Sequence, residues 1–386
     1  MCLGDLVQDG QGPFQDRGHP CGRRLRRFVR RGRRRERRRA ARFRGGGNRD
    51  AQHSARLCGR AERSPVYVSN GYSRVASGKD GSTLLEVHNA WGRSRAAECV
   101  AGAGDVNGDG VPDLLVGDVE SQMVVGVRSE FPHSRGVVRV LSGVDGALIH
   151  ILTSPARGRV DMFGAALAAL GDIDGDGYAD FAVSAPLGWP TWEPDQKWPG
   201  TGAVFVFSGR TALCLHVIQS DNTGELFGWT IAAAKHPTVE GSALLAVSCP
   251  SRTVRIHTTS DWTSKLLARS HSMPGYLDDF GSSMEFALDP KTKCATALVI
   301  GAAENDFAFD EGYAEVYPLD ERPMIQLAST RQEGLDACAL DDIDGDGVAD
   351  FVYVGVKTMT LTLVSGRKGE AIRTISLLQK PTENPR

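Results

Sequence analysis

Three copies of one nine-residue acidic loop, each followed at once by an apolar run, constrain this chain more than any other feature. The copies lie in GDVNGDGVPDLLVG at 104–117, GDIDGDGYADFAVSAP at 171–186 and DDIDGDGVADFVYVG at 341–355. We name residues 105–113, 172–180 and 342–350 the first, second and third acidic loops. A motif that recurs along a chain in this way is the signature of a repeat architecture.

A second set of motifs extends the repeat. Phe-Gly pairs precede equivalent apolar runs, and repeats begin near residues 96, 163, 227, 280 and 333. Each repeat also holds an apolar strand, a Ser-Gly or similar turn and another strand, a pattern that predicts a β-hairpin. The clearest hairpin copies are at 73–87, 137–152, 203–218 and 361–375.

Each repeat thus supplies about four short strands and no helix signal. We expect an all-β fold over residues 64–380, a β-propeller of four-stranded blades, with 381–386 as a tail. Five repeats and the leading hairpin make about six blades' worth of chain. A solenoid or a series of sandwiches is the alternative, but radial closure protects strand edges and favours the propeller.

The acidic loops carry the ligand chemistry of a hard cation. Side-chain oxygens fall at loop positions 1, 3, 5 and 9, and position 7 can offer its backbone carbonyl. Oxygen ligands at ~2.3–2.6 Å in a flexible shell suit Ca²⁺ better than Mg²⁺, which demands near-octahedral geometry. Glycines at positions 4 and 6 let the backbone wrap the ion. The loops contain no His or Cys, the ligands typical of zinc sites, which argues against zinc. The predicted calcium ligands, for up to three ions, are Asp105, Asn107, Asp109, Val111, Asp113, Asp172, Asp174, Asp176, Tyr178, Asp180, Asp342, Asp344, Asp346, Val348 and Asp350.

Two repeats have lost this pattern. Their aligned segments read HPTVEGSAL at 236–244 and DPKTKCATA at 289–297, with too few carboxylates to hold calcium. We expect these two blades to fold without metal.

The Phe-Gly pair, the acidic loop and the apolar strand together resemble FG-GAP repeats, as in integrin alpha subunits and bacterial VCBS/FG-GAP proteins. The resemblance covers roughly residues 65–380 and is most specific at 163–186. It implies a seven-bladed propeller with structural calcium loops on one face and partner contacts on the opposite face. A seven-bladed ring would leave this chain short of one or more blades. Adhesion carries over less readily than the fold, because function resides in sites grafted on folds.

The first 63 residues differ in kind from the rest. They hold 19 arginines, no lysine and six acidic residues, whereas the formal net charge of the whole chain is −2. A nucleic-acid or nuclear-targeting patch, a transit peptide, self-repelling disorder and out-of-frame translation of GC-rich DNA are all open interpretations. The acidic remainder of the chain disfavours nucleic acid as a partner, and we leave 1–63 out of the fold argument.

No catalytic motif is visible, such as G-x-S-x-G or H-E-x-x-H, so we expect a non-catalytic binding protein. The alternative is a hydrolase or lyase that uses the central pocket of the propeller. Residues 187–200 place Trp189, Trp192 and Trp198 among prolines, which suits a protein or sugar partner unless they pack on their own blade. A shorter acidic and aromatic loop at 304–312 leaves the same choice.

The expected location of the protein is inferred from its calcium loops, because the sequence shows no secretory signal peptide. The chain has no run of about 20 apolar residues and no apolar signal region near residue 1. A misplaced start would explain a missing signal peptide. Weak calcium sites suit the millimolar calcium outside the cell, so we expect an extracellular or cell-surface protein.

Overall fold

The computed structural model describes residues 72–77, 79–88, 99–119, 136–155, 161–187, 201–220, 225–250, 252–270, 280–302, 312–330, 335–355 and 359–377. All of them belong to the unit formed by residues 41–386. The regular structure in these ranges is β-strand throughout. No helix long and apolar enough for a membrane span occurs among the described residues.

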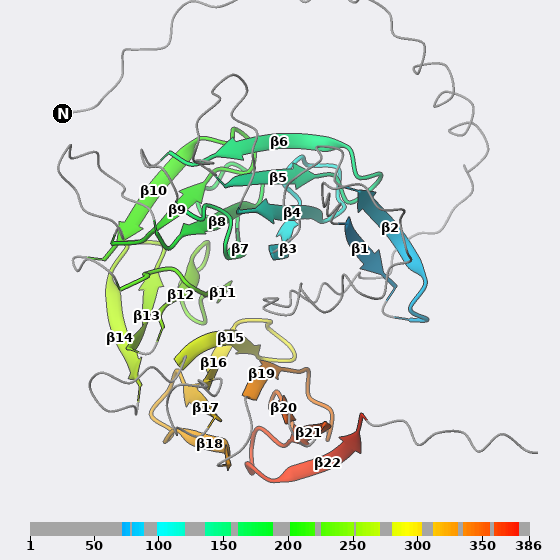
Figure 1. The fold of residues 1–386 in the computed structure, drawn as a ribbon, viewed down its shortest axis with the longest axis vertical. Helices are drawn as coiled ribbons and strands as arrows, with labels where there is room; N and C mark the ends of the chain where they lie inside the picture. The colour runs from blue at the N-terminus through cyan, green and yellow to red at the C-terminus, as the bar shows by residue number, and fades with distance from the viewer. Residues whose placement is uncertain are drawn as a thin grey trace, which may run out of the picture. The chain divides into compact units, whose positions relative to one another are not determined.

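The strands form one hairpin and five four-stranded sheets (Figure 1). The hairpin pairs β1 (Tyr72–Ala76) with β2 (Thr83–His88). The first sheet holds β3 (Cys99–Gly104), β4 (Asp113–Asp118), β5 (Val137–Leu141) and β6 (Leu148–Thr153). The second sheet holds β7 (Leu167–Gly171), β8 (Asp180–Ala185), β9 (Ala203–Phe207) and β10 (Cys214–Gln219).

The remaining three sheets repeat the arrangement. The third sheet holds β11 (Ile231–Lys235), β12 (Ala243–Cys249), β13 (Thr253–Thr258) and β14 (Ser264–Arg269). The fourth holds β15 (Phe280–Leu288), β16 (Ala295–Ala302), β17 (Gly312–Pro318) and β18 (Ile325–Thr330). The fifth holds β19 (Leu335–Ala339), β20 (Phe351–Gly355), β21 (Thr360–Val364) and β22 (Ala371–Ser376). Every sheet is an antiparallel meander in chain order, so the five predicted repeats and the leading hairpin are confirmed.

Burial explains the apolar pattern of the strands. The second and third strands of the first two sheets, β4, β5, β8 and β9, are buried along their whole length. The fourth strands β6, β10 and β22 are mostly exposed. A middle strand needs apolar residues on both faces because each sheet is covered by its neighbours, while a fourth strand lies at the sheet edge.

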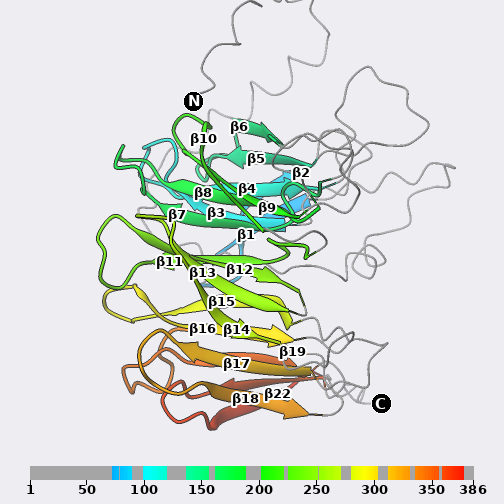
Figure 2. The same ribbon diagram turned by 90° about the vertical axis from the view of Figure 1, so that its left-hand side faces the viewer.

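The sheets pack face to face in chain order, as Figures 1 and 2 show. Leu115 and Val138 of the first sheet share a core with Phe181 and Phe205 of the second. Equivalent cores join the second sheet to the third, the third to the fourth and the fourth to the fifth. Stacked four-stranded meanders of this kind are the blades of a β-propeller, so the expected all-β propeller fold is confirmed.

The Phe-Gly pairs join neighbouring blades. Phe163 is fully buried and its ring meets Phe205 and Phe207 edge-on, with centroids 6.0 and 6.1 Å apart. Gly164 has a φ of 91°, and an added Cβ would lie 3.0 Å from Val138 Cγ2 in the first sheet. The glycine is therefore required both by its backbone conformation and by the close approach of two blades.

Candidate metal centre

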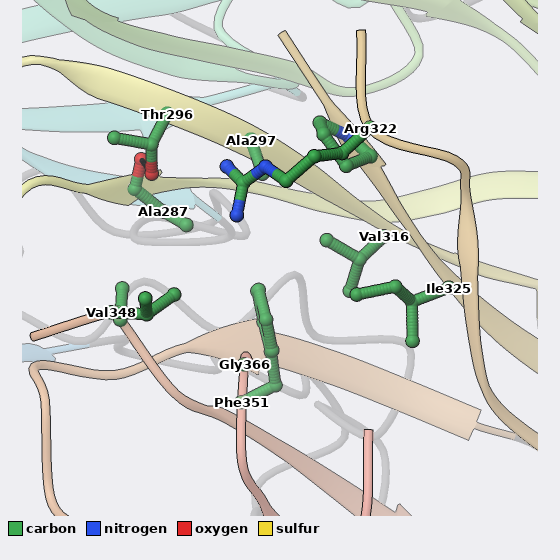
Figure 3. A pocket seen from close by; sticks show the side chains of 11 residues that line it. Ala287, Thr296, Ala297, Val316, Arg322, Ile325, Val348, Phe351 and Gly366 are labelled. Carbon is green, nitrogen blue, oxygen red and sulfur yellow. Dashed lines mark hydrogen bonds between the residues drawn. The ribbon is translucent and has the colours of Figure 1, made fainter. Parts of the chain in front are cut away.

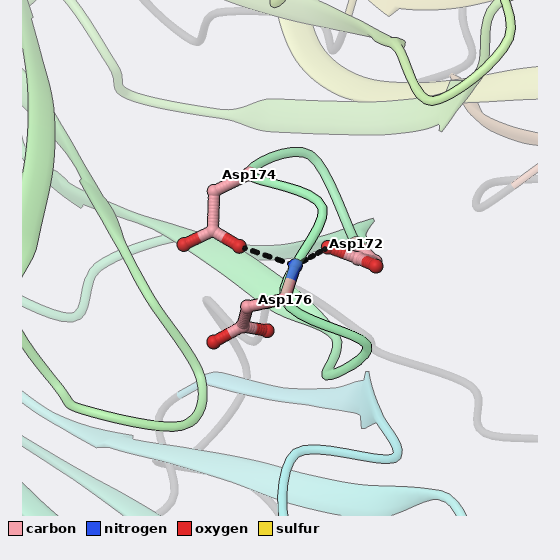
Figure 4. Close-up of side chains that lie close together, drawn as sticks. All are labelled: Asp172, Asp174 and Asp176. Atoms are coloured by element: carbon pink, nitrogen blue, oxygen red, sulfur yellow. Dashed lines mark hydrogen bonds between the residues drawn. The ribbon is translucent and has the colours of Figure 1, made fainter.

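The second acidic loop connects β7 to β8 and gathers three carboxylates. Asp172, Asp174 and Asp176 each offer an oxygen, and these atoms all lie within 4.8 Å of one another (Figure 4). In the third loop, between β19 and β20, Asp342, Asp344 and Asp346 form the same group. Positions 1, 3 and 5 are thus brought together as the sequence predicts.

The cluster geometry is set by backbone hydrogen bonds to the carboxylates. Asp172 Oδ1 accepts from the N–H groups of Gly175 (2.7 Å) and Asp176 (3.1 Å), and its Oδ2 accepts from Gly177 N (2.9 Å). Asp174 Oδ1 accepts from Asp176 N at 3.1 Å. Because one side chain receives three donors of its own turn, these bonds hold the loop in a tight curl with its three carboxylates close together.

The first acidic loop, between β3 and β4, has the same conformation although position 3 is an asparagine. Asp105 accepts from Gly108, Asp109 and Gly110, and Asn107 Oδ1 accepts from Asp109 N at 2.9 Å. The amide oxygen of Asn107 therefore stands where the other loops have a carboxylate oxygen. Asparagine is an ordinary calcium ligand, and the change removes one negative charge from this loop.

The glycines at positions 4 and 6 all have positive φ values, which confirms the expected backbone path. The six residues, with φ between 77° and 89°, are Gly108, Gly110, Gly175, Gly177, Gly345 and Gly347. A residue with a Cβ would be strained in this conformation, so the spacing of the glycines belongs to the loop shape itself.

The aspartate at position 9 has a role that the sequence interpretation missed. Asp180 is fully buried, and its two oxygens accept from Ile173 N and from Gly209 N, both at 3.0 Å. Asp113 and Asp350 make the equivalent pairs of bonds. Position 9 stays a predicted ligand, and it also ties each acidic loop to the turn between the third and fourth strands of its blade.

That tie also explains the Ser-Gly turns. A Cβ on Gly209 would lie 1.8 Å from the carbonyl oxygen of Ala179, at position 8 of the second loop. The paired occurrence of Asp at position 9 and Ser-Gly in the following hairpin was the sequence signal for this contact.

Burial raises the pKa of the Asp180 carboxyl, and that of Asp113, against the opposing effect of the two N–H donors.

The donor chemistry fits a hard divalent cation. The clustered ligands are oxygens only, and neither metal-capable group contains His or Cys. Carbonyl oxygens of Val111, Tyr178 and Val348 at position 7, with the aspartates at position 9, complete the predicted set. Three close carboxylates repel one another without a counter-ion, so a cation would stabilise this conformation.

The two degenerate turns are closed by other groups. In the third sheet, His236 Nδ1 accepts from Thr238 N (3.1 Å) and Val239 N (3.0 Å). In the fourth sheet, Asp289 Oδ1 accepts from Lys291 N (2.9 Å) and Thr292 N (2.7 Å). Neither turn carries a group of three acidic residues among those described.

A recess lies between the fourth and fifth sheets and is drawn in Figure 3. Its described lining is apolar apart from Thr296 and Arg322 and contains no acid–base pair for catalysis.

Some residues singled out in the sequence lie outside the described part of the chain. They are Trp189, Trp192 and Trp198, the loop at 304–311 and the Arg-rich segment 1–63.

Comparison with known proteins identifies the repeat. Residues 163–207 match the FG-GAP repeat family. Integrin alpha-IIb of Homo sapiens is 34% identical over 148 residues, which are 34% of this chain and 12% of that subunit. Integrin alpha-PS2 of Drosophila melanogaster is 36% identical over 110 residues, 27% of this chain and 7% of that subunit. The match thus spans about an eighth or less of these relatives' lengths.

Two solved structures align with part of this chain at low identity. BBS1N in complex with ARL6DN aligns with a TM-score of 0.49 and 7% identity, over 78% of this chain and 75% of that one. The exotype rhamnogalacturonan lyase YesX aligns with a TM-score of 0.40 and 14% identity, over 78% of this chain and 56% of that one. At these TM-scores and sequence identities, neither structure supports an argument about function.

Proposed function

We propose that this chain, an FG-GAP repeat protein similar to integrin alpha subunits, is a non-catalytic, calcium-binding scaffold for a protein or carbohydrate partner outside the cytosol. The observation that carries the proposal is the recurrence of one oxygen-lined loop in three blades, with the same hydrogen bonds each time. A repeated ligand set in one conformation is what a structural ion requires.

The role of the ion follows from where the loops lie. Each loop joins the first two strands of a blade and is tied by position 9 to the next hairpin. An ion bound by positions 1, 3, 5, 7 and 9 would hold the carboxylates together and stabilise the folded blade. Sites of ~10⁻⁴–10⁻³ M affinity would be filled by extracellular calcium, which supports a location outside the cell or at its surface.

Thermal unfolding tests the calcium part. After treatment with a chelator, 1 mM CaCl₂ should raise the melting temperature by about 5–10 °C, since three sites of ~0.1 mM affinity together contribute about 4 kcal/mol. The triple variant Asp105→Asn, Asp172→Asn, Asp342→Asn is the matched control and should not respond. An equal rise in both proteins would contradict calcium binding by these loops.

Partner binding needs a separate test. We propose Trp189, Trp192 and Trp198 as partner contacts, because rigid aromatic side chains dominate recognition surfaces. The intact chain, with calcium, should bind at least one member of a panel of extracellular-matrix proteins and glycans. Changing the three tryptophans to alanine should abolish that binding, whereas Leu213→Ala, at a side chain that is 67% exposed in the turn between β9 and β10 of the same blade, should not. Full binding by the tryptophan variant would overturn this assignment.

A further inference from the structure

The first and second acidic loops touch each other directly. The carbonyl oxygen of Asp105, position 1 of the first loop, accepts a hydrogen bond from Ala179 N, position 8 of the second, at 2.9 Å. The Tyr178 ring lies against the backbone of the first loop, because a Cβ on Gly108 would be only 2.8 Å from Tyr178 Cε1. Two loops that are 67 residues apart in sequence therefore share one packed boundary.

The residues at this boundary are those that position ligands. Ala179 stands between Tyr178, whose carbonyl is a predicted ligand, and Asp180, which anchors the loop. Asp105 supplies the first carboxylate of its own loop and receives three of that loop's N–H groups. A shift of residues 178–180 is therefore transmitted to Asp105 through one backbone hydrogen bond.

Packing beneath the boundary leaves little freedom for independent movement. Val106, position 2 of the first loop, is 1% exposed and belongs to the core between the first and second sheets. A Cβ on Gly209, in the turn held by Asp180, would lie 3.0 Å from Val106 Cβ. Ordering of the second loop and its turn therefore also restrains the first loop, through the contact between Gly209 and Val106.

The third acidic loop has no such neighbour among the described residues. The preceding blade presents the degenerate turn at 289–294, which lacks a carboxylate cluster. One contact across that boundary near the degenerate turn is an exposed ion pair, Lys293 Nζ to Asp341 Oδ1 at 3.1 Å, and Asp341 lies outside the nine-residue loop. The described residues thus hold one interlocked pair of acidic loops, and no hydrogen bond between the third loop and another acidic loop.

We propose that the first and second acidic loops bind their cations with positive cooperativity, while the third binds independently. This inference rests on the proposed function, calcium binding by the loops. An ion in the second loop orders residues 178–180 and with them Asp105, so the ion in the first loop meets a site already arranged. Ion–ion repulsion opposes the effect but is weakened by solvent and by the carboxylates around each ion.

Calcium titration calorimetry in an Asp342→Asn background tests the proposal, because only the paired loops then remain. Two ions should bind with a Hill coefficient of about 1.4, the value for roughly fivefold coupling of two equal sites. Adding Asp105→Asn should leave one ion, bound by the second loop about fivefold more weakly than in the pair.

A side-chain variant separates coupling from ligand loss. Tyr178→Ala keeps the backbone carbonyl and the Ala179–Asp105 hydrogen bond but removes the ring from Gly108, so two ions should still bind, with a Hill coefficient below that of the parent. Tyr178→Phe, which retains the ring, should behave as the parent. Two ions bound with a Hill coefficient of 1 by the parent, and unchanged affinity after Asp105→Asn, would overturn the coupling while leaving calcium binding intact. No heat of binding in the wild-type chain would instead overturn the proposed function and the coupling with it.

Discussion

The blades with acidic loops and the two blades without them have the same strands but close the turn between the first two strands differently. In the first, second and fifth sheets, a buried aspartate at position 9 joins loop and hairpin turn. In the third sheet the hydroxyl of Thr259 accepts from Ala243 N at 2.8 Å in the corresponding place. The comparison teaches that a blade can join these two turns without a buried aspartate at position 9 and without carboxylates at positions 1, 3 and 5.

The buried and the exposed aspartates of one loop make different contacts. Position 9 is buried and accepts two backbone N–H groups, as Asp180 shows. Positions 1, 3 and 5 of the second loop are exposed or half-buried and lie close together. We expect substitutions at position 9 to change stability with or without calcium, and substitutions at position 1 to change stability only with calcium.

The largest effect should come from Asp180→Ala. It leaves the N–H groups of Ile173 and Gly209 without their acceptor in a buried place, at a cost of about 3 kcal/mol of unfolding free energy. Urea unfolding in excess chelator measures it. Thr259→Ala, the counterpart in a blade without an acidic loop, should cost about 1 kcal/mol. A negligible loss for Asp180→Ala under chelator would show that position 9 serves only the metal.

The third sheet should respond to acid through His257. The side chain is 5% exposed and its Nε2 has no hydrogen-bond partner among the described residues. Burial, then Arg255 and His216, lower the pKa of His257 to about 4 from 6.5. Its contribution to stability is present above pH 6.5 and is lost as the pH falls from 6.5 towards 4, amounting to about 2 kcal/mol at pH 5.

Urea unfolding at pH 7 and pH 5 measures this acid sensitivity. His257→Gln should lose about 2 kcal/mol less between these pH values than the wild-type chain. Identical pH dependence in the two proteins would exclude a buried neutral histidine at 257.

Position 1 of an acidic loop should matter only when calcium is present. Asp172→Asn should remove about 1.4 kcal/mol of unfolding free energy at 1 mM calcium, the contribution of one site of ~0.1 mM affinity, and little in chelator. Asp289→Asn, at the same place in a degenerate turn, should have the same effect in both solutions. The measurement is chemical unfolding with and without calcium, and a calcium-dependent effect at Asp289 would break the distinction between the two kinds of blade.

The smallest effect should come from Arg367, beside the third acidic loop. Its Nε lies 3.5 Å from Asp346 Oδ2 and its guanidinium donates to the Asp346 carbonyl oxygen at 2.9 Å. A cation on a ligand competes with the ion, so Arg367→Ala should tighten calcium binding to this loop by about two- to fivefold, the range for an exposed ion pair. Arg210→Ala is the control, because Arg210 lies over the Tyr178 ring at 4.9 Å and not on a ligand carboxylate. Weaker binding after Arg367→Ala would show that the guanidinium supports the site.

Sequence alone predicts the features that are local in the chain. The repeat starts, the hairpins around Ser-Gly turns and the positive φ of glycines at positions 4 and 6 all follow from short motifs. The role of Asp180, the contact of Tyr178 with Gly108 and the burial of His257 do not, because each depends on how strands of different hairpins or blades pack. Periodicity specifies which face of a strand is buried but not which residue of the next blade lies against it.

Direct counting of bound calcium tests the central claim, that three equivalent carboxylate turns each hold one ion. Equilibrium dialysis of the chelator-treated chain against millimolar calcium should give three ions per chain. The variant with Asp105, Asp172 and Asp342 all changed to asparagine should give none. Fewer than two ions on the wild-type chain, or equal binding by the triple variant, would contradict the account.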